Sequence, residues 1–290
     1  MELHKKPTYF GISATKKILK LAKLLEISLD TSANYELPLL PNTNFFDTDS
    51  EIFDPPRLFQ SIMGTLSWIS GSVCPENITA CNKFSHFQAN HRLIHFRLAK
   101  RVVKYLLNTS TYGIKYEVIS LPLNIHVYVD SNFERQNGKF STYGFIIYVN
   151  SQIYKAKSKR FTQLATSTCL VETWAMLAAI PEVKQLQKML TELQQPIDTI
   201  LFYCDNKATV DIFSEVKLTP AVRSLDLRDL AVRQEFIKNK CYDITFIPTR
   251  CNIADFFTKL VPRDLFLEFR NQMISNLLYC GYFLLKIAVF

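Results

Sequence analysis

Apolar and polar residues alternate most regularly near the middle of the chain, in the sequence NIHVYVDSNFERQNGKFSTYGFIIYV. The alternating run Ile125–Val129 ends at an acid, Asp130, and a second apolar run occupies residues 144–149. Between the two runs lies Asn137-Gly138, a dipeptide that favours tight turns between antiparallel strands. The pattern therefore predicts a β-hairpin with Asp130 at the end of its first strand.

The chain beyond residue 150 alternates between short apolar runs and longer amphipathic stretches. Short apolar runs predict buried strands and longer periodic stretches predict helices, so the second half of the chain is predicted to be α/β with five strands. After the hairpin, strands are predicted at residues 152–158, 199–204 and 242–247, and helices at 168–193, 221–240 and beyond residue 252.

The first half of the chain shows helical periodicity, with apolar residues recurring every three or four positions. Residues 34–56 are different, because they contain four prolines among clustered Asn, Asp, Ser and Thr residues. That composition predicts an extended connection. Helices are predicted over residues 11–27, 57–73, 76–88 and 90–109.

The net charge of the chain is +8 at pH 7, which fits a polyanionic partner such as nucleic acid. Basic residues gather on the predicted helix at 90–109, and no Asp or Glu occurs between Glu76 and Glu117. Such a face either is simply solvated or contacts a phosphate backbone independently of sequence. The basic residues concerned are Arg97, Lys100, Arg101 and Lys104.

The seven cysteines are odd in number and include no CxxC pair, which favours reduced thiols in an intracellular, cytoplasmic protein. His91 and His95 have the spacing of a helical zinc pair, but Arg92 replaces the required glutamate and no third ligand is evident, so zinc is not expected. The N-terminus has no apolar core for a signal peptide. The apolar C-terminal run is short and contains Lys286, so no membrane span is predicted.

Four acids stand at comparable places in the predicted elements. Asp130 and Asp205 follow strands, whereas Glu172 and Asp255 lie in the first turns of helices. Open α/β sheets form their sites at the carboxyl ends of strands, so the four side chains can share one pocket; the alternative is a set of scattered surface acids. Clustered carboxylates need cations to stay ionised together, and a ligand set of oxygens favours Mg²⁺ or Mn²⁺.

Four segments of the second half resemble, in order, the ribonuclease H domain of copia-type LTR retrotransposon Pol polyproteins: YVDSNF, SKRFTQLATSTCLVETWAM, YCDNKATV and IPTRCNIADFFTKLVP. The second segment aligns with the family's SKKQ and SSTEAEY motifs without a gap from Ser158 to Glu172. Upstream, PENITACNKFSHFQ and HFRLAKRVVKYLLNTSTYGIKY resemble the end of the family's reverse transcriptase. Nearly the whole chain is covered by the resemblance.

The resemblance implies a ribonuclease H-like mixed five-stranded sheet flanked by helices, preceded by a mainly helical region like a reverse-transcriptase thumb or connection. The implied organisation is an N-terminal helical segment (1–33), an extended linker (34–56), the helical region (57–120), the ribonuclease H-like domain (121–262) and a C-terminal tail (263–290).

The implied activity is hydrolysis of the RNA strand of RNA–DNA hybrids. Asp130, Glu172, Asp205 and Asp255 would be the catalytic and metal-binding residues that hold two Mg²⁺ ions, with Mn²⁺ as a substitute. The implied partners are the hybrid or another nucleic acid and the rest of a Pol polyprotein, in the cytoplasm, in a particle or in the nucleus. Nucleic-acid contacts are expected from Arg97, Lys100, Arg101, Lys104, Lys157, Lys159, Arg160 and Asn206.

The chain also departs from the family. The polymerase palm is missing, since YVDS at residues 128–131 belongs to the ribonuclease H strand. Leu170, Val171 and Thr173 replace the family's Glu, Ala and Tyr, and Phe161 replaces a Gln, while the four acids are kept. Two other functions stay open: an inactive remnant that binds nucleic acid or only folds, and a polynucleotidyl transferase of the integrase type.

Overall fold

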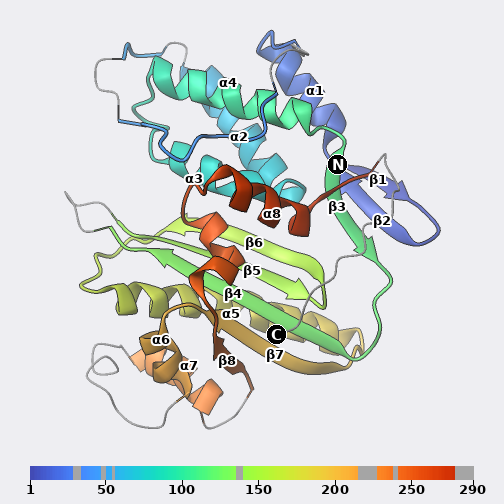
Figure 1. Ribbon diagram of the computed structural model, residues 1–290, viewed down its shortest axis with the longest axis vertical. Coiled ribbons are helices and arrows are strands. Elements are labelled where there is room, and N and C mark those ends of the chain that lie inside the picture. Colours follow the sequence, from blue (N-terminus) through green and yellow to red (C-terminus); the bar gives the residue numbers. More distant parts are fainter. Residues whose placement is uncertain are drawn as a thin grey trace.

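A five-stranded sheet in the second half of the chain organises the fold in the computed structural model (Figure 1). Its strands are β4 (Leu123–Asn132), β5 (Thr142–Val149), β6 (Gln152–Arg160), β7 (Ile197–Cys204) and β8 (Asp243–Phe246), in the order β6-β5-β4-β7-β8. β5 is antiparallel to both β4 and β6, whereas β4, β7 and β8 run parallel. The predicted α/β fold with a mixed five-stranded sheet is confirmed. The structure describes residues 1–28, 34–46, 50–53, 56–134, 140–214, 227–237 and 241–277.

Helices α5 (Thr168–Glu192), α6 (Lys207–Ser214) and α7 (Leu227–Ile237) cover one face of this sheet. α5 begins after Ser167, whose hydroxyl oxygen accepts a hydrogen bond from the Leu170 amide at 3.2 Å and so caps the helix. Its small and branched residues recur every fourth position, so one side of α5 is buried against β4 and β5. The predicted helix at 168–193 is confirmed. α6 was not predicted, because its eight residues are too few to show a clear helical period of apolar residues.

Helices from the first half of the chain cover the opposite face. They are α1 (Thr15–Leu24), α2 (Pro56–Ser72), α3 (Ile78–Ser85) and α4 (Leu93–Asn108), with the 3₁₀ turn η1 (Pro75–Asn77) before α3. The same buried cluster takes in Ile146 and Tyr148 of β5, the 3₁₀ turn η4 (Ile253–Phe257) and α8 (Arg263–Met273). The core of this layer therefore continues across the boundaries predicted near residues 120 and 262.

A second, four-stranded sheet brings together distant parts of the chain. Its strands are β1 (Glu2–Lys5), β2 (Tyr9–Ser13), β3 (Tyr112–Glu117) and β9 (Ser275–Asn276), in the order β1-β2-β3-β9. Strands were not predicted in the helical regions 1–33 and 57–120, and α8 and β9 lie where a C-terminal tail was expected at 263–290. The strands are short and their partners are remote in sequence, as in the pair Ile12 and Ile114. A local sequence pattern therefore does not predict them.

The last predicted helix of the ribonuclease H-like region is also different. After β8 the structure forms η3 (Thr249–Cys251) and then η4, which are 3₁₀ turns, where a helix beyond residue 252 was predicted. Residues 252–258 are all buried, so the segment has no polar face and no amphipathic helical period. The predicted turn at Asn137-Gly138 and the first part of the predicted helix at 221–240 lie outside the described residues.

Candidate metal centre

The four predicted acids come together at the carboxyl ends of β4 and β7, two inner strands of the five-stranded sheet. Asp130 lies near the end of β4 and Asp205 directly follows β7, and these strands are parallel neighbours. Carboxylate oxygens of Asp130, Asp205 and Asp255 lie within 4.8 Å of one another. Ligand atoms of Glu172, Asp205 and Cys204 form a second group of the same size. Asp205 belongs to both groups, so it joins all four acids into one cluster.

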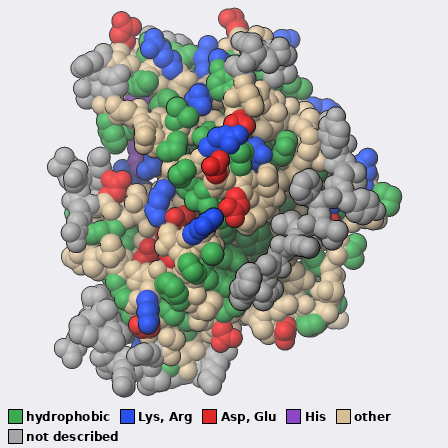
Figure 2. Space-filling view, in the orientation of Figure 1, with side chains coloured by type: hydrophobic (Ala, Val, Ile, Leu, Met, Phe, Trp, Pro, Cys, Tyr) green, Lys and Arg blue, Asp and Glu red, His purple; other side chains and the backbone are tan. Residues whose placement is uncertain are grey.

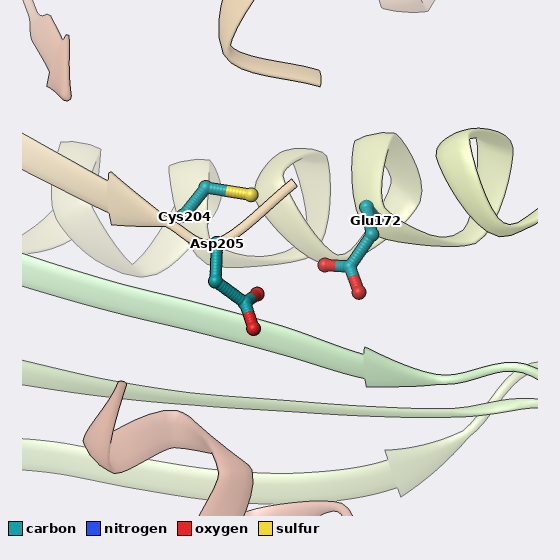
Figure 3. A group of neighbouring side chains, drawn as sticks. All are labelled: Glu172, Cys204 and Asp205. Carbon is teal, nitrogen blue, oxygen red and sulfur yellow. The ribbon is translucent and has the colours of Figure 1, made fainter. Parts of the chain in front are cut away.

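Glu172 and Asp205 approach the cluster from different elements (Figure 3). Glu172 projects from the first turns of α5 and Asp205 from the end of β7, and both carboxyl groups extend toward β4. The thiol of Cys204 also borders this group, but burial raises the pKa of Cys204 well above its ordinary value. A thiol that stays protonated is a poor ligand for a hard cation, so the useful donors here are oxygens.

Asp130 is the most buried member of the cluster, with 2% of its surface exposed. The Thr258 hydroxyl donates a hydrogen bond to its Oδ2 atom, which fixes the carboxylate in one orientation. Burial, and then the charges of Glu172 and Asp255, raise the pKa of Asp130 well above its ordinary value. The cluster is therefore short of positive charge.

Glu172 is also short of partners, because one of its carboxylate oxygens accepts no hydrogen bond from the described residues. Its Oε1 atom accepts a hydrogen bond from the Ser131 amide at 3.3 Å, but its buried Oε2 atom has no hydrogen-bond partner among the described residues. Burial raises the pKa of Glu172 to about 8, and the charge of Asp205 acts in the same direction. A divalent cation beside Oε2 would satisfy this oxygen, so the residues fit a metal ion with oxygen ligands.

Asn252 ties the cluster to the sheet. Its Nδ2 atom donates hydrogen bonds to the Val129 carbonyl at 2.9 Å and to Oδ1 of Asp205 at 3.3 Å. Its Oδ1 atom accepts a hydrogen bond from the Ala254 amide at 3.1 Å and so caps η4. One buried amide thus holds the turn that carries Asp255 against the end of β4. From the sequence, Asn252 was known only as a residue before a predicted helix, so this role was missed.

Gly144 lets η4 approach this closely. It lies on β5 directly opposite Asp130, and a Cβ atom at this position would lie 2.5 Å from Cβ of Phe257. Any larger residue would push η4, and Asp255 with it, away from the sheet. The glycine is therefore part of the geometry of the cluster.

Lys259 is a basic residue that reaches the acids, and no role was predicted for it from the sequence. Its ammonium lies 2.8 Å from Oδ1 of Asp255 and 3.9 Å from Oδ2 of Asp130. Burial alone would lower the pKa of Lys259, but the facing carboxylates of Asp130 and Asp255 raise it. The sequence offered two signals, the i, i+4 spacing of Asp255 and Lys259 and the place of both residues in the segment IADFFTK.

The predicted nucleic-acid contacts on α4 do not join the cluster. α4 packs on α1 and α2, at the end of the molecule away from η4 (Figure 1). Lys100 lies over the Phe96 ring at 5.1 Å, and Arg101 and Lys104 lie over the Tyr35 ring at 5.3 and 5.2 Å. Arg97 is exposed. These side chains form a separate basic and aromatic surface.

The other predicted contacts lie on the ribonuclease H-like sheet and beside it. Lys157 pairs with Glu182 at 3.3 Å, whereas Lys159 and Arg160 are exposed at the end of β6. Asn206 accepts a hydrogen bond from the Thr209 amide at 3.1 Å at the start of α6. Acidic and basic side chains are intermixed on the face shown in Figure 2, so this face has no field of a single sign.

The structure also shows the contacts of the two histidines with zinc-like spacing, the state of six cysteines and the character of the described helices. The ring nitrogens of His95 bond to the Phe45 carbonyl at 2.9 Å and the Arg92 amide at 2.9 Å, and His91 bonds to the Gln88 carbonyl at 3.2 Å, as structural histidines do. None of the six cysteines in the described part of the chain forms a disulfide. The helices that the structure describes lack the length and apolar character that a membrane span requires.

Comparison with curated proteins finds retrotransposon Pol polyproteins as relatives of this chain. It is 23% identical over 283 residues to the Retrovirus-related Pol polyprotein from transposon RE1 of Arabidopsis thaliana, covering 94% of this chain and 18% of the relative. It is 30% identical over 149 residues to the Transposon Ty1-NL2 Gag-Pol polyprotein of Saccharomyces cerevisiae, covering 50% of this chain and 8% of the relative. The chain thus spans less than a fifth of the length of these relatives. No protein-family model matches.

Among solved structures, the chain is similar to ribonucleases H. The structure of LC11-RNase H1 in complex with an RNA/DNA hybrid is 14% identical, with a TM-score of 0.35 over 46% of this chain and 92% of the other. The N-terminal RNase H domain of a Mycobacterium tuberculosis protein is 13% identical, with a TM-score of 0.34 over 52% of this chain and 98% of the other. The assignment of the fold rests on the strand order and directions given above.

Proposed function

We propose that this chain is a metal-dependent nuclease of the ribonuclease H type, which hydrolyses the RNA strand of RNA–DNA hybrids. The observation that carries the proposal is the convergence of Asp130, Glu172, Asp205 and Asp255 from four separate elements on one edge of the sheet. Retrotransposon Pol polyproteins as relatives support the same reading, because they make nucleic acid the natural context of the chain.

The four acids would hold the metal. Their donors are carboxylate oxygens, which suit Mg²⁺ or Mn²⁺, and the unpartnered Oε2 atom of Glu172 leaves one buried donor available for a cation. When bound, a pair of such ions supplies activation of the attacking water and stabilisation of the leaving oxygen of a phosphodiester. Asp205, which belongs to both ligand groups, would be one of the residues that hold the metal.

The surrounding residues would act by holding the acids in place. Thr258 orients Asp130, the Ser131 amide orients Glu172, and Asn252 holds Asp205 and the η4 turn. These partners are buried or nearly so, which limits the motion of the acids and keeps them poised for cations. The chain would therefore contribute to catalysis a rigid set of carboxylate oxygens at the carboxyl ends of β4 and β7.

The substrate would be held mainly through its backbone. Proteins read RNA-containing duplexes through phosphates and 2′-hydroxyls more than through base edges. Lys159 and Arg160, exposed on β6, and the α4 surface of Arg97, Lys100, Arg101 and Lys104 are the proposed contacts. Their separation favours an extended duplex over a short ligand, and binding through them would weaken steeply with salt.

The test is cleavage of a labelled RNA–DNA hybrid by the full chain with Mg²⁺. Asp205→Asn removes the shared carboxylate and is expected to lower the rate by more than about 100-fold. The matched control is Asp198→Asn, an exposed acid on the same strand, which should cut at the parent rate. An intact hybrid with the parent protein, or equal cleavage by Asp205→Asn, would contradict the proposal.

The same assay separates the proposal from its rivals. Salt-dependent binding of the hybrid without cleavage would select a nucleic-acid-binding remnant. Joining of one strand to another, instead of hydrolysis, would select a transferase of the integrase type.

A further inference from the structure

Lys259 occupies an unusual place for a lysine, because its ammonium faces two of the most buried acids of the chain. It lies 2.8 Å from Oδ1 of Asp255 and 3.9 Å from Oδ2 of Asp130. The side chains of these acids are only 10% and 2% exposed, whereas that of Lys259 is 41% exposed. The ammonium therefore contacts two buried acids although the Lys259 side chain as a whole is partly exposed.

We propose that Lys259 is the resident cation of the Asp130–Asp255 pair, and that a divalent metal ion must displace it to bind there. This inference rests on the proposed metal centre and adds a device that sets its affinity. Two carboxylates at short range repel each other in a buried site, so one positive charge between them stabilises the metal-free protein. The same charge competes with an incoming cation for the same oxygens.

The local structure allows the ammonium to leave without disturbing the acids. The Thr258 and Lys259 amides both donate hydrogen bonds to the Asp255 carbonyl, at 3.2 and 3.1 Å, so the backbone is fixed at the end of η4. Thr258 independently orients Asp130. Only the flexible stem of Lys259, with its strongly hydrated head, needs to swing outward, and its exposure gives it a path to water.

The experiment is a calorimetric titration of the full chain with Mn²⁺, comparing the parent protein with Lys259→Met. Removal of the competing charge should lower the Mn²⁺ dissociation constant by roughly fivefold or more, the usual range of coupling between two ligands. Lys155→Met is the matched control, because Lys155 is 40% exposed and pairs with Glu182 at 2.6 Å, outside the cluster. It removes the same net charge and should leave the Mn²⁺ affinity unchanged.

A second measurement needs no metal binding by the parent. In EDTA, Lys259→Met should melt at a lower temperature than the parent, and excess Mn²⁺ should close the gap. Lys259→Gln keeps much of the stem and should follow Lys259→Met in both measurements, whereas Lys259→Arg keeps the charge and should follow the parent.

The outcomes separate this inference from the proposed function. Equal Mn²⁺ affinity of the parent and Lys259→Met would overturn the role of Lys259 and leave the metal centre standing. Weaker Mn²⁺ binding by Lys259→Met would overturn it too, as would an unchanged affinity with weaker hybrid binding, which would make Lys259 a phosphate contact. No Mn²⁺ binding by either protein would overturn the metal centre itself and this inference with it.

Discussion

The two faces of the central sheet are covered in different ways. The layer of α5, α6 and α7 comes from the same half of the chain as the sheet, and its core lies between residues 123 and 242. The opposite layer is assembled from residues 14–114 and 253–274, which are far apart in sequence. β5 serves both, since Phe145 and Ile147 face the first core and Ile146 and Tyr148 face the second.

The candidate metal centre depends on both layers. Glu172 comes from α5 and Asp255 from η4 on the other side, while Asp130 and Asp205 come from the sheet between them. Loss of order in either layer would remove one acid and leave the other three unable to complete the site. The layer that holds Asp255 against the sheet, here called the supporting wall, consists of the upstream helices α1 to α4 together with η4 and α8.

Polar contacts strengthen this wall where it meets the sheet. The Thr79 hydroxyl, at the start of α3, donates a hydrogen bond to the Phe256 carbonyl in η4 at 2.5 Å. Asn82 donates a hydrogen bond from its Nδ2 atom to the Ser158 hydroxyl of β6 at 2.8 Å. The first contact joins the first half of the chain to the turn that carries Asp255, and the second joins it to β6. Substitutions in the supporting wall are therefore expected to change metal binding at the centre.

The largest effect is expected where the wall touches the sheet most closely. In Gly144→Ala the new Cβ atom would meet Cβ of Phe257 at 2.5 Å and its carbonyl carbon at 3.0 Å. We expect the free energy of unfolding to fall by about 3 kcal/mol and Mn²⁺ affinity to fall with it, because η4 must shift. Chemical denaturation and Mn²⁺ titration measure the two losses.

The matched control is Gly64→Ala, in α2, where the new Cβ atom meets nothing within 4 Å. It should raise stability by about 0.5 kcal/mol, as alanine does inside a helix, and leave Mn²⁺ affinity unchanged. If Gly144→Ala were as stable as the parent and bound Mn²⁺ equally well, the close packing of η4 would not position Asp255.

A smaller effect is expected from pH, through a buried acid of the wall. Burial raises the pKa of Glu76 to about 7, and hydrogen bonds from Tyr105 and Asn77 offset this only in part. Between its ordinary value of 4.5 and this value the folded protein holds a proton that the unfolded chain releases. The contribution of Glu76 to stability is therefore full below pH 4.5 and is lost as pH rises through about 7.

Glu76→Gln isolates this contribution. The free energy of unfolding of the parent should fall, relative to that of Glu76→Gln, by on the order of 2 kcal/mol between about pH 5 and about pH 8. Urea denaturation at several pH values measures the difference, and Glu268→Gln, at an exposed position on α8, should keep the profile of the parent. Parallel profiles for the parent and Glu76→Gln would show that Glu76 keeps an ordinary affinity for protons.

The smallest effect is expected from the contact between α3 and η4. Thr79→Val keeps the shape of the buried side chain but leaves the Phe256 carbonyl without this donor, which should cost about 1 kcal/mol of unfolding free energy. Mn²⁺ affinity should fall by a few-fold, about 3 to 10, because η4 is less well held. Thr79→Ser, which keeps the hydroxyl, should recover both; a Thr79→Val protein with the parent's Mn²⁺ affinity would confine Thr79 to a structural role.

The features that the sequence predicted correctly depend on local patterns. The strands β4 to β8, the helix α5 and the positions of the four acids follow from alternation, helical periodicity and the ends of short runs. Resemblance to copia-type Pol polyproteins added the order of these elements and the proposed role of the acids, which stays a prediction. Lys259 and Asn252 were missed, because their roles depend on neighbours 123 to 129 residues away.

The sequence by itself determined the α/β class of the second half, the amphipathic helices of the first half and the four acids as candidates for one site. Only the tertiary structure decided that the first half covers one face of the sheet, that β2 pairs with β3, and that η4 is a buried 3₁₀ turn held by Gly144 and Asn252. The physical reason is that these contacts join residues remote in sequence, and their stabilisation depends on packing that no short stretch of the chain records.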